Sequence, residues 1–186
     1  MGFFDFGGLI PHFSRADSRR FAALASEPGA LLGVQDATAY LGRATTQTTV
    51  MKTLAEIEAE VARLSERIAA PGNAYPTFGY SADFARPHIE IGGGQYHYVA
   101  VERGTEVFRK STSDLDELLY WIFDGVTFSM ACAYELEHRI PGQDFRRLMF
   151  SKRVELLTSI DPDMGRRGKE QIAETLRNAP FNDDRA

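Results

Sequence analysis

Apolar residues recur at alternating spacings of three and four after residue 53, which is the period of one face of an α-helix. Thr53 precedes this stripe and Glu56 follows three residues later, so the two are expected to form a capping box. In a capping box the Thr oxygen accepts a hydrogen bond from a backbone N–H of the first helical turn, and the Glu carboxylate accepts one from the Thr backbone N–H. A Pro-Gly pair at positions 71–72 ends the pattern. The sequence therefore predicts a helix with one buried face, formed by Leu54, Ile57, Val61, Leu64 and Ile68.

The hydrophobic period changes to two between residues 87 and 111. Three short strands are predicted, at 88–91, 96–102 and 105–110, and glycine-containing turns separate them. They form an antiparallel meander. Tyr98 shares one face of the middle strand with its neighbours two residues away, and the alternation leaves open which face meets the helices.

From Leu118 onward apolar residues lie on all sides of the expected helix axis, which predicts a buried central helix. Thr112 or Ser113 is expected to cap it, and Gly125 is the expected place for a kink. The Pro-Gly pair at 141–142 is expected to end it.

Two more helices are predicted, at 144–160 and from about Arg167 to Arg177, with Asp161-Pro162 as the break between them. The fold class is therefore α+β. It consists of an N-terminal helix, a three-stranded antiparallel meander, and a C-terminal group of about three helices with a buried central helix.

A domain boundary is predicted near Val50, just before the capping box. Residues 1–50 form an extension in which we expect little order, because it contains Pro28-Gly29 and the polar run 45–49. Residues 51–186 form a single domain. Since this domain opens beside Met51, we hypothesise that Met51 is the natural start, which N-terminal mass spectrometry of the native protein would test.

The composition is that of a globular protein with a real core: 186 residues, 44% hydrophobic and 25% charged. The net charge is −5, and the acidic excess lies in residues 51–138, which hold 14 acidic and 7 basic side chains. This balance argues against direct nucleic-acid binding, which requires a concentrated basic surface. An acidic protein is better suited to a basic partner.

Neither apolar stretch of the chain has the features of a membrane or export segment. The N-terminal stretch contains Asp5 and has no preceding basic residues, and the run 118–134 is shorter than a spanning helix and includes Asp124. The single cysteine, Cys132, cannot form an internal disulfide. We expect a cytoplasmic protein that does not contact the membrane.

Two groups of residues are candidates for chemistry. Glu135 and His138 have the i, i+3 spacing of helical metal sites, but no second copy of the motif exists, so an ionic network with Arg139 is the favoured reading. His88, Glu90 and His97 could converge across the first hairpin as metal ligands or acid–base residues, although polar residues on a strand face usually meet water. We therefore predict no catalytic residues, no metal and no cofactor.

A basic stripe lies near the helix predicted at 144–160, and it forms either a solvated face, in which nearby carboxylates can pair with it, or an anion site. Its members are Arg146, Arg147, Lys152 and Arg153, and the available carboxylates are Asp144 and Glu155. A solvated face is the favoured interpretation.

Six short blocks are specific in combination: YPTFGYS from Tyr75, PHIEI from Pro87, YHYVAVERG from Tyr96, DLDELLYWIF from Asp114, YELEHRI from Tyr134 and QDFRRLMF from Gln143. On these blocks, residues 51 to about 183 resemble the immunity protein 63 family of bacterial polymorphic toxin systems. The resemblance implies a small cytoplasmic protein that neutralises a toxin encoded beside it. It implies binding, and it transfers neither catalytic residues nor an inhibitory surface.

We therefore predict an immunity protein that occludes its cognate toxin in a stoichiometric complex, with acidic residues steering a basic partner, such as a nuclease. The predicted partner-binding residues are Tyr98, Glu102, Asp114, Asp116 and Glu117. The last three also have a simpler explanation as solvated residues that complement a helix dipole. Two alternatives stay open: a small hydrolase-like enzyme using His88/His97 or Glu135/His138, and a structural homodimer formed through the exposed sheet face.

Overall fold

The protein is described by a computed structural model that covers residues 51–183. The predictions for residues 1–50, including the extension and the natural start at Met51, lie outside the described residues or are not tested by them. Within 51–183 the predicted α+β class and the order of its elements are confirmed.

The first helix, α1 (Leu54–Ser65), begins with the predicted capping box. The Thr53 N–H donates to the Glu56 carboxylate at 2.9 Å, and the Glu56 N–H donates to the Thr53 hydroxyl at 3.3 Å. These bonds satisfy two of the N–H groups that a helix start leaves without intrahelical partners. A 3₁₀ turn, η2 (Glu66–Ile68), continues the buried stripe as far as Ile68.

The predicted meander is present and is extended by one strand. The sheet order is β1 (Thr77–Phe78), β2 (Pro87–Gly92), β3 (Gln95–Glu102) and β4 (Thr105–Thr112). β1 pairs with β2 in parallel, whereas β2–β3 and β3–β4 are antiparallel, so the sheet is mixed. β1 was not predicted, because two residues are too short to show an alternation.

The structure decides which face of β3 is covered. Tyr98 is buried, packs beside Phe108 at 5.6 Å between ring centroids, and brings its hydroxyl close to Gly125 of the central helix. The Tyr96–Tyr98–Ala100 face therefore lies against the helices. The opposite face of the sheet carries His88, Glu90 and His97.

The three later helices are α2 (Leu115–His138), α3 (Arg146–Ile160) and α4 (Pro162–Asn178). α2 is capped by Asp114 rather than by Thr112 or Ser113, and it ends before the predicted 141–142 stop. α4 begins five residues before the predicted Arg167. Asp161-Pro162 ends α3, as predicted, and also starts α4: the Asp161 carboxylate caps α4 and Pro162 occupies its first turn, where its missing N–H costs nothing.

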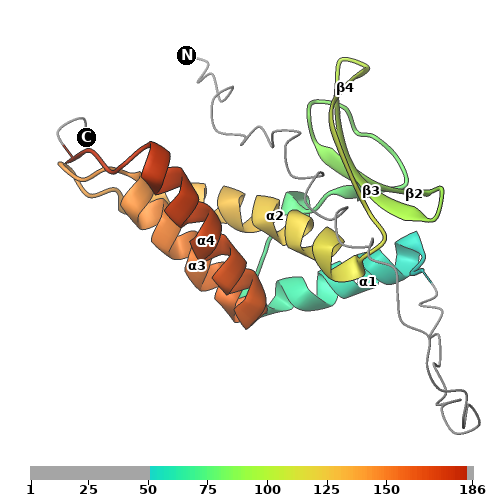
Figure 1. Cartoon of the computed structure of the whole chain (residues 1–186), viewed down its shortest axis with the longest axis horizontal. Helices are drawn as coiled ribbons and strands as arrows, with labels where there is room; N and C mark the ends of the chain where they lie inside the picture. Colours follow the sequence, from blue (N-terminus) through green and yellow to red (C-terminus); the bar gives the residue numbers. More distant parts are fainter. Residues whose placement is uncertain (1–50, 184–186) are drawn as a thin grey trace, which may run out of the picture. The chain divides into compact units, whose positions relative to one another are not determined.

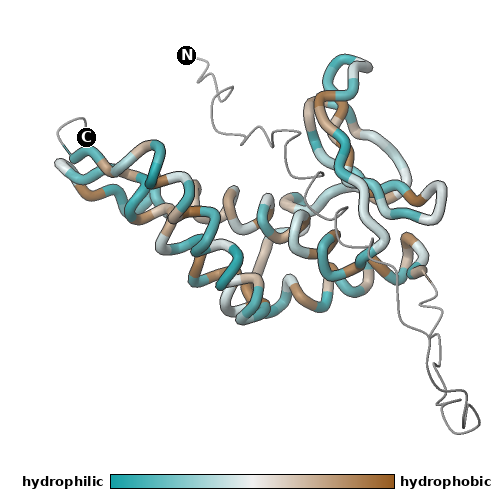
Figure 2. Tube along the Cα trace, viewed as in Figure 1, coloured by the Kyte–Doolittle hydropathy of each residue, from teal (hydrophilic) through white to brown (hydrophobic). Residues whose placement is uncertain are grey.

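α2 holds the domain together. Figure 1 shows the sheet near the beginning of α2 and the α3–α4 hairpin along the rest of it. The core is centred on α2 residues with no exposed surface, such as Leu118, Ile122 and Phe123. Hydrophobic and hydrophilic positions alternate along the helices in Figure 2, as expected for helices that bury one side. None of the helices within 51–183 is both long and apolar enough to cross a membrane.

Candidate functional site

The beginning of α2 carries two free negative charges. The Asp114 carboxylate accepts the N–H of Asp116 at 2.9 Å, and the N–H of Asp114 donates to the Thr112 hydroxyl at 3.0 Å. The side chains of Asp114 and Asp116 are exposed, and neither forms an ion pair within residues 51–183. Helix dipole and capping account for both residues structurally, yet their charge also faces solvent.

Glu117, the third acidic residue of this turn, is held by α4. Its carboxylate pairs with the Arg167 guanidinium at 2.7 Å, and both side chains are one-third exposed. Arg167 also lies 3.6 Å from the ring centroid of Tyr120, and burial raises the pKa of that tyrosine to about 12. Glu117 thus links α2 to α4 and presents less charge than its neighbours. We call Asp114, Asp116 and Glu117 the acidic end.

The start of α1 lies close to the acidic end. The Lys52 N–H donates to the Tyr96 hydroxyl at 2.7 Å, and Tyr96 is the register partner of Thr112, two residues before the α2 cap. The capping hydrogen bond from the Thr53 backbone, helped by Lys52, lowers the pKa of Glu56 to about 2. A further carboxylate therefore stays ionised near this end of the domain.

The other two predicted partner-binding residues are not placed beside these acids. Tyr98 is only 7% exposed, and burial together with the charge of Asp124 raises its pKa, as expected for a tyrosine in the core. Glu102 is exposed, but it lies six residues along β3 from Tyr96, which corresponds to about 20 Å of strand. The structure brings together Asp114, Asp116 and Glu117 and separates Tyr98 and Glu102 from them.

His88, Glu90 and His97 do lie together on the outer face of the sheet, as the hairpin predicted. His88 Nε2 is 2.9 Å from a Glu90 oxygen, and Arg109 donates to the other oxygen at 2.8 Å. The hydrogen bond from Arg109, and to a smaller extent the one from His88, lowers the pKa of Glu90. His97 lies opposite Glu90 but contacts the Ser111 hydroxyl at 2.7 Å instead. These residues form a polar network between strands.

Glu135 and His138 point to different partners. Glu135 is buried and accepts two hydrogen bonds from Arg139, both of 2.8 Å, so the favoured ionic network is confirmed. His138 stacks on Tyr134 at 4.1 Å between ring centroids. In the part of the chain that the structure describes, no group of three or more histidine, cysteine, aspartate or glutamate side chains is arranged to hold a metal ion.

A polar network that the sequence revealed only in part joins the start of α3 to the C-terminal segment. The Asp144 carboxylate, almost fully buried, accepts hydrogen bonds from the Arg146 backbone at 3.0 Å, from the Arg146 guanidinium at 2.6 Å and from the Asn182 N–H at 2.9 Å. In return, Asp183 accepts the Asp144 N–H at 2.9 Å and pairs with Arg147 at 3.0 Å.

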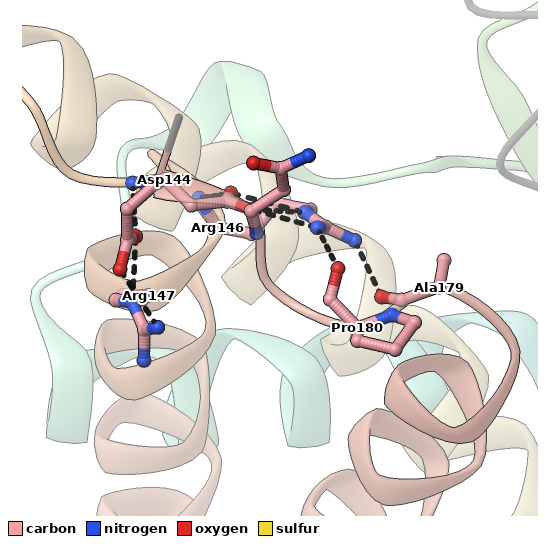
Figure 3. A network of polar contacts seen from close by, with 7 residues as sticks. Asp144, Arg146, Arg147, Ala179 and Pro180 are labelled. Carbon is pink, nitrogen blue, oxygen red and sulfur yellow. Dashed lines mark hydrogen bonds and ion pairs between the residues drawn. The ribbon is translucent and has the colours of Figure 1, made fainter. Parts of the chain in front are cut away.

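Arg146 completes the network by donating to the carbonyl oxygens of Ala179 and Pro180 at 2.9 and 2.8 Å (Figure 3). We call the network of Asp144, Arg146, Arg147, Asp183 and the segment 179–183 the C-terminal latch. The pairing of the basic stripe with Asp144 was predictable from their proximity in sequence. The contacts with 179–183 were not, because they span more than thirty residues.

A comparison with protein families shows which family part of the chain matches. Residues 92–174 match the model of the immunity protein 63 family. The match runs from the β2–β3 turn through most of α4, so it includes both the acidic end and the first half of the latch. No curated protein and no solved structure matches the chain.

The immunity protein 63 match confirms the predicted family resemblance over those residues. A match to this family implies toxin neutralisation.

Proposed function

We propose that the protein neutralises a cognate toxin domain as a stoichiometric, non-enzymatic inhibitor in the cytoplasm, and that its acidic end faces the toxin. The observation that carries the proposal is the immunity protein 63 match over residues 92–174. The exposed, unpaired carboxylates of Asp114 and Asp116 support the choice of surface.

Electrostatics explains how such a surface works. Two exposed carboxylates on a rigid helix start attract a basic patch over a distance of about one Debye length, roughly 8 Å at physiological salt. The attraction mainly accelerates association, and the contact then covers the toxin's cleft. A toxin that cleaves nucleic acid has a basic substrate channel, so a nuclease is the partner that we propose for this surface.

The test is a survival assay in bacteria that express the full chain with the toxin domain encoded by the neighbouring gene. The informative variant is D114N/D116K, because asparagine retains the helix cap while three units of negative charge are removed, one at Asp114 and two at Asp116. We expect slower association, a steeper loss of protection at high salt, and an unchanged melting temperature.

The matched control is E137Q/E174K, which changes the net charge by the same three units. Both carboxylates are exposed. Glu137 is in the last turn of α2, about 30 Å along the helix from Glu117, and Glu174 is in the last turns of α4. Equal loss of protection in both variants would show that net charge alone matters and would remove the acidic end from the proposal. Failure of the unaltered chain to protect or to copurify with the toxin would refute the function itself.

The enzyme alternative is tested separately with H88A. His88 is buried and bound to Glu90 on the outer sheet face. Stoichiometric inhibition predicts full protection as long as H88A folds. Loss of protection with the toxin complex still intact would favour an enzyme.

A further inference from the structure

Exposed apolar side chains gather where α2 passes into α3. Leu136, Ile140 and Phe145 are 69%, 49% and 49% exposed, and they are three of the seven exposed large hydrophobic residues found within 51–183. Ile140 and Phe145 line a hollow of about 570 Å³ that the α2–α3 connection shares with residues 179–182. We call these three residues and the hollow the α2–α3 corner.

The C-terminal latch keeps this corner in one shape. Asp144 lies between the two apolar residues of the connection, and its buried carboxylate is bound by Arg146 and by the Asn182 N–H. Phe181 of the latch packs beside Phe150 at 6.2 Å between ring centroids and lies under the guanidinium of Arg147 at 4.3 Å. A buried polar network of this kind restrains the connection, so a partner would meet a preorganised surface.

The charges around the corner are of both signs, and most of them are paired. Glu135 pairs with Arg139, and Arg147 pairs with Asp183, so each positive charge already has a negative partner. Glu137 is exposed and has no ion pair within the described residues, while the Arg139 side chain is still 56% exposed. The corner therefore has both an available acid and an accessible cation beside its apolar residues.

This mixture of acidic and basic side chains distinguishes the corner from the acidic end. A basic partner needs an acidic surface, whereas a two-fold contact between identical chains brings a patch against itself and therefore needs one that is self-complementary. In such a contact Glu137 of one copy can meet Arg139 of the other, with Leu136, Ile140 and Phe145 buried between them. α2 has 24 residues, so the corner lies about 36 Å from the acidic end and the two negative ends stay apart.

We infer that two copies of the chain associate through their α2–α3 corners and leave both acidic ends free. An apolar cluster beside a rigid hollow is the kind of surface that oligomers bury. The inference concerns the free protein and does not depend on the toxin.

The test is the solution mass of the full chain, measured by light scattering and sedimentation equilibrium from low micromolar to several hundred micromolar concentration. We expect the mass to rise towards twice the 20.8 kDa of one chain. L136E and F145E place a charge in the contact and should weaken association about tenfold or more. Both side chains are exposed in one copy, so both variants should fold.

The matched control is F84E, the same substitution at a phenylalanine that is 89% exposed in the β1–β2 connection. It should associate like the unaltered chain. A single-chain mass at every concentration, or F145E associating as well as F84E, would overturn the inference. A monomeric chain whose F145E variant loses the toxin complex would also overturn it, and would assign the corner to the toxin instead.

Discussion

The C-terminal latch gives the sharpest test of how the corner is held, through the substitution D144A. The Asp144 carboxylate accepts the Arg146 backbone N–H, two guanidinium N–H groups and the Asn182 N–H at distances of 2.6 to 3.2 Å. Its removal leaves Arg146, whose side chain is 16% exposed, without a counter-charge. Breaking one side of a buried ion pair costs about 3–5 kcal/mol.

The expected cost of D144A is somewhat lower, about 2–4 kcal/mol, because Arg146 keeps its bonds to Ala179 and Pro180. D144N keeps the acceptor oxygen and should cost less. The measurement is urea unfolding of the full chain followed by circular dichroism, together with hydrogen exchange at the Asn182 amide. That amide should lose protection before the core amides do.

The control for D144A is D163A, which removes an exposed carboxylate paired with Arg166 and should change the free energy of unfolding by less than about 1 kcal/mol. Equal stability of D144A and D163A would refute the role given to the latch. So would an Asn182 amide that stays protected in D144A.

The latch also predicts acid sensitivity. Arg146, followed by the backbone N–H groups of Asn182 and Arg146, holds the pKa of Asp144 far below its usual value. A carboxylate with a depressed pKa in the folded protein stabilises it fully above the unfolded pKa, and this stabilisation is lost as pH falls. The loss should begin below about pH 4, and it should be smaller in D144A, as acid titrations of both proteins would show.

The remaining predictions concern helix packing and capping. G165A should destabilise the protein by about 1–3 kcal/mol despite the better helix propensity of alanine, because the added Cβ would lie 2.9 Å from the backbone Cα of Thr158. In G168A the added Cβ meets only the end of a leucine side chain, so this variant should lose less stability in urea unfolding. Equal losses would contradict the packing argument. E56Q should reduce the stability that is lost between about pH 4.5 and pH 2. The reason is that the hydrogen bond from the Thr53 backbone lowers the pKa of Glu56 to about 2, so the ionised carboxylate stabilises the fold above that range. An unchanged acid profile would show that the capping box does not contribute to the pH dependence of stability.

Features that depend on neighbouring residues were predictable from the sequence. The Thr53–Glu56 capping box, the three longer strands and the Glu135–Arg139 pair each involve residues at most a few positions apart or a regular period. The start of α4 was wrongly placed because Asp161-Pro162 was interpreted only as the end of one helix. The pair ends α3 and caps α4 at the same time.

Features that depend on distant contacts were not predictable in the same way. The alternation in β3 showed that Tyr98 lies on one of two faces of the strand, but not which face is covered by the helices. The contact with Gly125 of α2 shows that the Tyr98 face is the covered one. Likewise, Asp144 and Asn182 are 38 residues apart, so no local pattern indicates their hydrogen bond. The acidic end was found because its three residues lie within four positions of the sequence, whereas Glu102 was grouped with them without a spatial reason.

The two proposals together predict that the two ends of α2 act independently. Substitutions more than about 10 Å apart without shared partners usually have additive effects, and the ends of α2 are about 36 Å apart. In a double-mutant cycle, D114N/D116K should slow toxin association equally in the unaltered chain and in F145E, while F145E should reduce the mass of the free protein equally with and without the charge change. A coupling free energy above about 0.5 kcal/mol would show that the toxin contacts both ends of α2 or binds the dimer in preference to a single chain. Additivity would mean that a single helix positions a toxin-facing surface at its beginning and a self-association surface at its end.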